Sequence, residues 1–79
     1  MNLSLFHMDV GALGKISGFD EAKISYKKRL LSMGITPNTP FKVTRIAPMG
    51  DPIEIKIKDY RLSLRKEEAK TIMVEEIEP

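Results

Sequence analysis

The segment Pro52–Lys58 alternates apolar and charged residues with a period of two. Successive side chains of a β-strand point to opposite faces of the sheet, so this spacing places Ile53, Ile55 and Ile57 on one strongly apolar face. Other elements of the chain must cover that face. Because the chain has 79 residues and no cysteine, packing alone must hold the fold together. We therefore expect residues 1–79 to form a single, mainly β domain around one modest core.

Two neighbouring segments have the same strand character. After a short polar break, Arg61–Arg65 alternates again, which turns Leu62 and Leu64 inward and predicts a tight hairpin with the isoleucine strand. Upstream, Phe41–Ile46 is rich in residues that favour strands, and Ala47–Pro52 is the loop that joins it to the isoleucine strand. The three strands are predicted to form an antiparallel meander.

A different period marks a helix between Asp20 and Met33. Asp20 is a candidate N-cap, and Gly34 is placed to end the helix in a left-handed conformation. In the turn that follows, Asn38 comes after a proline and is expected to have a positive φ. The apolar stripe of this helix consists of residues spaced by three or four positions: Ala22, Tyr26, Leu30 and Met33.

Two more strands complete the predicted topology. Gly14–Phe19 comes before the helix, and Ile72–Glu75 follows a helical turn at Lys66–Lys70. The count is therefore five strands, with one α-helix inserted between strands 1 and 2. A small open sheet would expose both edges, so we expect the strands to curl into an SH3-like antiparallel barrel.

Four segments, in this order, resemble the signature of the ferrous iron transport protein A (FeoA) family: Arg29–Pro37, Ala47–Pro52, Leu62–Ala69 and Ile72–Val74. The resemblance extends from Gly11 to Val74. It implies an SH3-like barrel and a cytoplasmic accessory role in bacterial ferrous iron uptake, beside the membrane permease FeoB, which carries a GTPase domain. It implies neither catalysis nor a cofactor.

The sequence departs from this family at two turns, where Asn38 and Asp59 stand in place of glycine. Both residue types tolerate a left-handed backbone, so we expect the turns to be kept. The chain is also similar to the C-terminal SH3-like domain of iron-dependent repressors of the diphtheria toxin repressor type. It contains no helix-turn-helix pattern, which favours the transport accessory over a stand-alone relative of that repressor domain.

The N-terminal segment Met1–Val10 lacks the basic leader of a signal peptide. No stretch approaches the ~20 apolar residues that are needed to cross a bilayer. We expect no membrane insertion, but a cytoplasmic protein that its partner recruits to the inner face of the membrane.

No catalytic, cofactor-binding or metal-binding residues are predicted. His7 is the only histidine, and we expect it to be exposed in a mobile N-terminal segment. Glu67 and Glu68 are adjacent on a helical turn and are expected on a solvated face, with Glu67 paired to Lys70. Alternate residues of a strand do not converge on one ion, so we assign no metal to the acidic tail, Glu75, Glu76 and Glu78.

Basic residues are concentrated between Lys23 and Lys66, so nucleic-acid binding is the alternative function. That mode would use basic residues interleaved with aromatic rings that stack on the bases. The strands supply the charge without the rings, through Lys42, Arg45, Lys56 and Lys58. We therefore favour a protein partner over nucleic acid.

The loop Ala47–Pro52, between the first and second meander strands, is the candidate contact site. Met49 is a large apolar residue at its tip, and the flanking prolines stiffen the loop, which lowers the entropy lost on binding. Two interpretations of Met49 stay open: a contact with the partner, or a plug folded back over the barrel end. The predicted partner-binding residues are Pro48, Met49, Gly50, Asp51, Pro52, Arg45 and Arg65.

Overall fold

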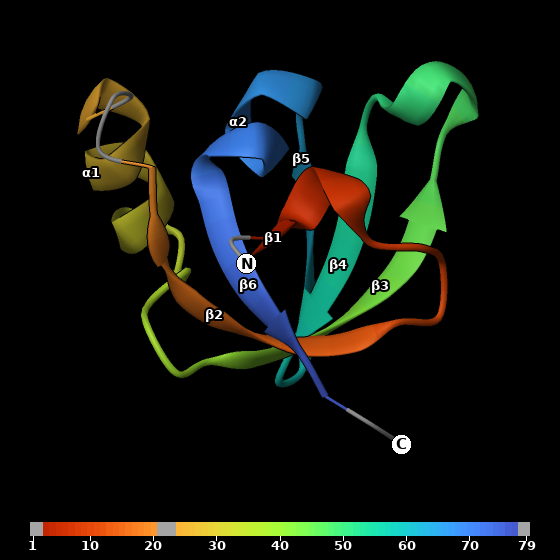
Figure 1. Cartoon of the computed structure of the whole chain (residues 1–79), viewed down its shortest axis with the longest axis horizontal. Coiled ribbons are helices and arrows are strands. Elements are labelled where there is room, and N and C mark those ends of the chain that lie inside the picture. Colours follow the sequence, from red (N-terminus) through yellow and green to blue (C-terminus); the bar gives the residue numbers. More distant parts are fainter. Residues whose placement is uncertain (1–2, 21–23, 78–79) are drawn as a thin grey trace.

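The computed structural model describes residues 3–20 and 24–77 as one antiparallel sheet with two α-helices and two short 3₁₀ helices (Figure 1). The strands are β1 (Leu3–Ser4), β2 (Leu13–Phe19), β3 (Pro40–Ile46), β4 (Ile53–Ile57), β5 (Tyr60–Leu64) and β6 (Ile72–Glu76). The helices are η1 (Leu5–His7), α1 (Ile24–Ser32), η3 (Pro48–Gly50) and α2 (Lys66–Thr71).

The six strands are hydrogen-bonded in the order β1-β6-β2-β3-β4-β5. All neighbouring strands are antiparallel, and two register shifts interrupt the ladders, between Ile16 and Gly18 in β2 and between Val43 and Arg45 in β3. The strands curve around one interior, while η1, α2 and η3 lie along one end of the sheet (Figure 1). The predicted meander of three strands is confirmed as β3, β4 and β5.

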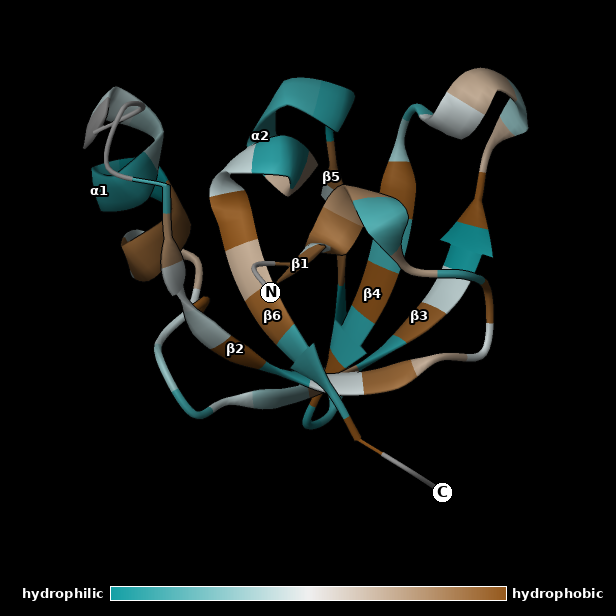
Figure 2. Cartoon of the chain, viewed as in Figure 1, coloured by the Kyte–Doolittle hydropathy of each residue, from teal (hydrophilic) through white to brown (hydrophobic). Residues whose placement is uncertain are grey.

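The predicted strand phase is also confirmed. Ile53, Ile55 and Ile57 are at most 1% exposed, and Leu30 and Leu64 belong to the same cluster of buried side chains. Apolar and polar residues alternate along β4 in Figure 2, as expected for a strand with one buried face.

The sequence-based count of five strands is wrong, because residues 3–8 are part of the fold. Leu3 pairs with Val74 and Ser4 with Met73, which adds β1 to the edge of β6. Leu5 is fully buried. The N-terminal segment is therefore a structural element rather than the mobile segment predicted. As a consequence, α1 lies between the second and third strands in chain order, β2 and β3.

The helices differ from the prediction in extent. The described part of α1 spans Ile24–Ser32, and Gly34 ends it with φ +92°, as expected. Ala22 lies outside the described residues, as does the start of the helix that Asp20 was predicted to cap. The predicted helical turn at Lys66–Lys70 is a six-residue α-helix, α2. No helix within residues 3–20 and 24–77 is long and apolar enough to cross a membrane.

Two turns test the predicted left-handed residues. Asn38 has φ +69°, which confirms the first prediction. In the β4–β5 hairpin the residue with positive φ is Lys58 (φ +53°), so the assignment of Asp59 is wrong. Ile57 pairs with Tyr60, which leaves a two-residue loop, and a positive φ at only its first position is the pattern of a type II′ turn.

Candidate partner-binding surface

The loop between β3 and β4 holds Met49 away from the protein. Met49 has φ +71°, and the residue is 92% exposed. Two backbone hydrogen bonds close the loop beneath it, from Ala47 N to Pro52 O (3.0 Å) and from Gly50 N to Ala47 O (2.9 Å). A side chain this exposed covers no core, so the interpretation of Met49 as a plug is wrong.

Asp51 connects this loop to the start of α2. Its Oδ1 lies 3.3 Å from Arg65 Nε and accepts a hydrogen bond of 3.2 Å from Lys66 N. The first backbone N–H groups of a helix have no partner within the helix, so the carboxylate satisfies one of them. Two predicted site residues, Asp51 and Arg65, are thus brought together.

Arg45 is not part of this cluster of contacts. It is exposed on β3, where Glu54 is its partner across the ladder. No hydrogen bond or ion pair joins it to Asp51 or Arg65 in the described part of the chain. It remains a candidate only because it lies close to the base of the loop.

Phe6 is a neighbour of the loop that the sequence did not predict. A Cβ atom at Gly50 would lie 3.4 Å from Phe6 Cε1, so the ring packs beside the backbone of η3. The Nζ atoms of Lys66 and Lys70 lie 5.5 and 5.1 Å from the ring centroid, within the range of cation–π contact. The spacing of Lys66 and Lys70 on the predicted helical turn could have indicated that both side chains lie on one side of it. Their aromatic partner could not be predicted, because Phe6 comes from the N-terminal segment.

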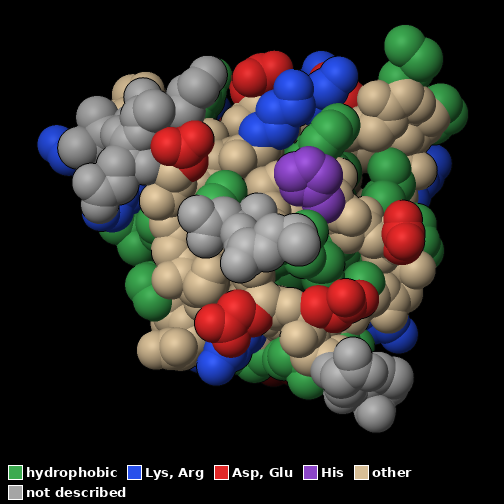
Figure 3. Space-filling view, viewed as in Figure 1, with side chains coloured by type: hydrophobic (Ala, Val, Ile, Leu, Met, Phe, Trp, Pro, Cys, Tyr) green, Lys and Arg blue, Asp and Glu red, His purple; other side chains and the backbone are tan. Residues whose placement is uncertain are grey.

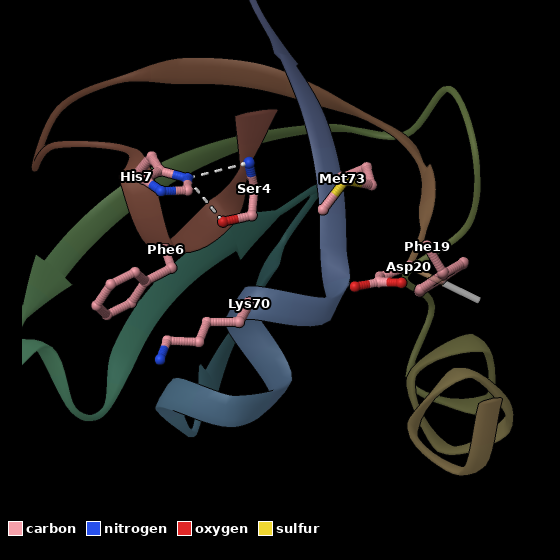
Figure 4. Close-up of a pocket in the computed structure, with 7 residues that line it drawn as sticks. All are labelled: Ser4, Phe6, His7, Phe19, Asp20, Lys70 and Met73. Carbon is pink, nitrogen blue, oxygen red and sulfur yellow. Dashed lines mark hydrogen bonds between the residues drawn. The ribbon is translucent and has the colours of Figure 1, made fainter. Parts of the chain in front are cut away.

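A cleft continues from Phe6 on the face of the molecule that includes His7 (Figure 4). It has a volume of about 610 Å³ and is lined by Ser4, Phe6, His7, Phe19, Asp20, Lys70 and Met73. In Figure 3, His7 (purple) lies near the middle of this face, with basic side chains (blue) directly above it. The cleft therefore has aromatic and basic groups along one rim.

His7 is exposed, as predicted, but it is held in place. Its Nδ1 lies 2.9 Å from Ser4 Oγ and 3.4 Å from Ser4 N (Figure 4). Ser4 holds it, and this contact was not part of the prediction for His7. Ser4 is only 4% exposed, and the pair spans the N-terminus of η1, so the contact acts as a helix cap.

Glu68 is buried, which makes the prediction of a solvated face wrong for this residue. It is 3% exposed, and its Oε1 accepts a hydrogen bond of 2.9 Å from Arg65 N. Its Oε2 has no hydrogen bond in the described part of the chain, but it forms an ion pair of 3.4 Å with Arg29 Nη1 of α1. The carboxylate therefore joins the two α-helices.

No three histidine, cysteine or acidic side chains are grouped closely enough to hold a metal ion within residues 3–20 and 24–77. In the acidic tail, Glu75 forms an ion pair of 3.7 Å with Lys15, while Glu78 lies outside the described residues. The described part of the tail shows a surface ion pair and no set of converging ligands.

Comparison with solved structures identifies the class of fold. A zinc complex of FeoA from Stenotrophomonas maltophilia, described as a prokaryotic SH3 domain protein, superposes with a TM-score of 0.79 at 20% identity and covers 92% of this chain and 89% of that one. This likeness shows an SH3-like fold. The NMR structure of a FeoA-like protein from Clostridium acetobutylicum matches with a TM-score of 0.88 and 33% identity, covering 99% of this chain and 90% of that one.

The family follows from the sequence itself. The model of the FeoA domain matches residues 1–76, so the chain belongs to the FeoA domain family. A relative from Porphyromonas gingivalis, an Fe(2+) transport protein A/Fe(2+) transporter FeoB fusion protein, is 40% identical over 55 residues. The match covers 70% of this chain and only 6% of that relative.

Proposed function

We propose that this chain is a non-catalytic accessory protein of ferrous iron uptake that binds a FeoB-type permease through the loop around Met49. The observation that carries the proposal is the relative in which a FeoA part and a FeoB part form one polypeptide. Fusion keeps two domains at a high effective concentration. Where the two are separate chains, the same association requires an interface of its own.

The loop is suited to form that interface. An exposed apolar side chain on a backbone closed by hydrogen bonds can contact a partner with little loss of conformational entropy. Asp51 ties the loop to Arg65 and to α2, so the loop and the charged groups near it act as one rigid patch. Arg45 and Arg65 supply charge at the rim, where such groups guide association more than they strengthen it.

The test is co-purification of the chain with the FeoB-type permease from membranes that contain both. We expect Met49→Asp to weaken binding by about tenfold, equivalent to about 1.4 kcal/mol, because it places a charge at the apolar contact. The free energy of unfolding should change by less than about 0.5 kcal/mol, since Met49 is exposed and not packed in the core.

The matched control is Leu31→Asp, which puts the same charge on an apolar residue that is 36% exposed on α1, on the other side of the molecule from η3 (Figure 1). This variant should bind like the parent protein once it is folded. If Met49→Asp and Leu31→Asp bind equally well, the interface lies outside the loop.

A further inference from the structure

Two lysines of α2 converge on one aromatic ring. Positions 66 and 70 are one helical turn apart and lie on the same side of α2, so both Nζ atoms reach Phe6, at 5.5 and 5.1 Å from its centroid. Two ammonium groups beside one ring make this part of the surface positively charged, which favours an anionic group as its ligand.

His7 adds a third donor beside the same ring. Its ring meets Phe6 edge to face, with centroids 6.0 Å apart. Its Nδ1 accepts the hydrogen bond of Ser4 N, so the neutral ring carries its hydrogen on Nε2. His7 is exposed, and this second nitrogen is therefore a donor available to a ligand.

An apolar centre lies between these donors and the loop. Gly50 packs against Phe6, and Met49 projects from the next position with 92% of its surface exposed. We call the group Phe6, His7, Met49, Lys66 and Lys70 the Phe6 surface. It continues into the cleft, which Phe6, His7 and Lys70 also line (Figure 4).

We propose that the Phe6 surface binds an acidic segment of the partner protein, with an apolar side chain of that segment against Phe6 and Met49 and its carboxylates on the two lysines and His7. The proposal rests on the proposed function and names the chemistry of the partner's contact. Charge complementarity carries it, because the surface has three donors and an apolar centre. Nucleic acid fits less well, since a strand of bases needs successive exposed rings and the Phe6 surface has one.

The first experiment is an NMR titration of the ¹⁵N-labelled full chain with a synthetic peptide in which a leucine is flanked by glutamates. The control peptide has glutamine at every glutamate position. We expect the acidic peptide to shift the amide signals of η1, η3 and α2, and the glutamine peptide to bind about tenfold more weakly or not at all. Shifts spread over all basic residues, or none in these three elements, would overturn the proposal.

The matched variants are Lys66→Gln/Lys70→Gln and Lys27→Gln/Lys28→Gln, which remove the same charge from α2 and from α1. Only the first should lower the affinity for the acidic peptide, by about tenfold. An equal loss of affinity in both double variants would mean that the peptide binds through the net charge of the protein and not at the Phe6 surface. Stronger binding of an oligothymidylate or of phosphatidylglycerol vesicles than of the peptide at these lysines would assign the surface to phosphate instead.

The two proposals fail in different ways. If Met49→Asp loses the permease while Lys66→Gln/Lys70→Gln retains it, the chain binds the permease but not through an acidic segment on α2. If the parent chain binds the acidic peptide at the Phe6 surface but does not co-purify with the permease, the proposal of permease binding is wrong. The proposal that the Phe6 surface binds acidic segments then still holds.

Discussion

The hydroxyl of Tyr60 occupies the space that a side chain at Gly34 would need. This hydroxyl donates a hydrogen bond of 3.3 Å to Met33 O, at the end of α1. A Cβ atom at residue 34 would collide with the hydroxyl oxygen of Tyr60. Gly34 also has φ +92°, which disfavours any other residue. The contact fixes the β4–β5 hairpin against the C-terminal end of α1.

Gly34→Ala should therefore destabilise the protein for two separate reasons, left-handed strain and displacement of Tyr60. We expect a loss of about 2 kcal/mol in the free energy of unfolding, measured by urea denaturation. In a Tyr60→Phe background the hydroxyl is absent, so the same change should cost about 1 kcal/mol, the strain alone. An equal cost in both backgrounds would show that Tyr60 moves aside freely.

Leu64→Ala tests the centre of the core. Leu64 is fully buried and pairs with Ile53 at the end of β5, so truncation leaves a cavity among well-packed side chains. We expect a loss of about 2 to 5 kcal/mol in the free energy of unfolding. Leu62→Ala is the control, since Leu62 is only partly buried on the same strand and should cost clearly less.

Asn38 tests the turn before β3. Its φ of +69° is a conformation in which alanine is strained and glycine is not. Asn38→Ala should destabilise by about 1 kcal/mol, while Asn38→Gly should be close to neutral. Thermal unfolding of the two variants side by side gives the comparison, and equal midpoints would contradict a left-handed residue at this position.

Most of the sheet could be predicted because its strands are amphipathic and long enough to show a period. β4 is the clearest case, with Ile53, Ile55 and Ile57 all buried as the alternation requires. β1 could not be predicted, because two residues contain no period and its stability comes from pairing with Met73 and Val74, about 70 positions away.

The candidate site also has a part that could be predicted from the sequence and a part that could not. The loop itself was predictable from the prolines around Met49, since local sequence determines a short loop, but the sequence left open whether Met49 points outward or folds back over the barrel. The Phe6 surface was not, because residues 6, 50, 66 and 70 become neighbours only through the fold. Nor could the sequence tell which of the adjacent residues Glu67 and Glu68 is buried, since both positions suit a helix.

The buried carboxylate of Glu68 leads to the last prediction. Arg29 is 66% exposed, so a count of surface charges would assign its ion pair with Glu68 little value. The stability lost on removing Arg29 depends instead on Glu68, the other partner of the ion pair. The side chain of Glu68 is 4% exposed, and Oε2 has no hydrogen bond within the described residues, so Arg29→Ala leaves a buried negative charge without its counter-ion.

We expect Arg29→Ala to lower the free energy of unfolding by about 2 kcal/mol or more, within the range for an uncompensated buried polar group. Arg65→Ala is the matched control. Neither end of its ion pair with Asp51 is buried, with side chains 68% and 30% accessible, so its loss should cost less than about 1 kcal/mol. Arg29→Lys should restore part of the loss, since an ammonium group still supplies the positive charge but lacks the forked geometry of arginine. Both alanine variants are measured by urea denaturation at the same salt concentration. Equal losses would mean that water reaches Glu68 and that the carboxylate does not depend on α1 for its charge balance.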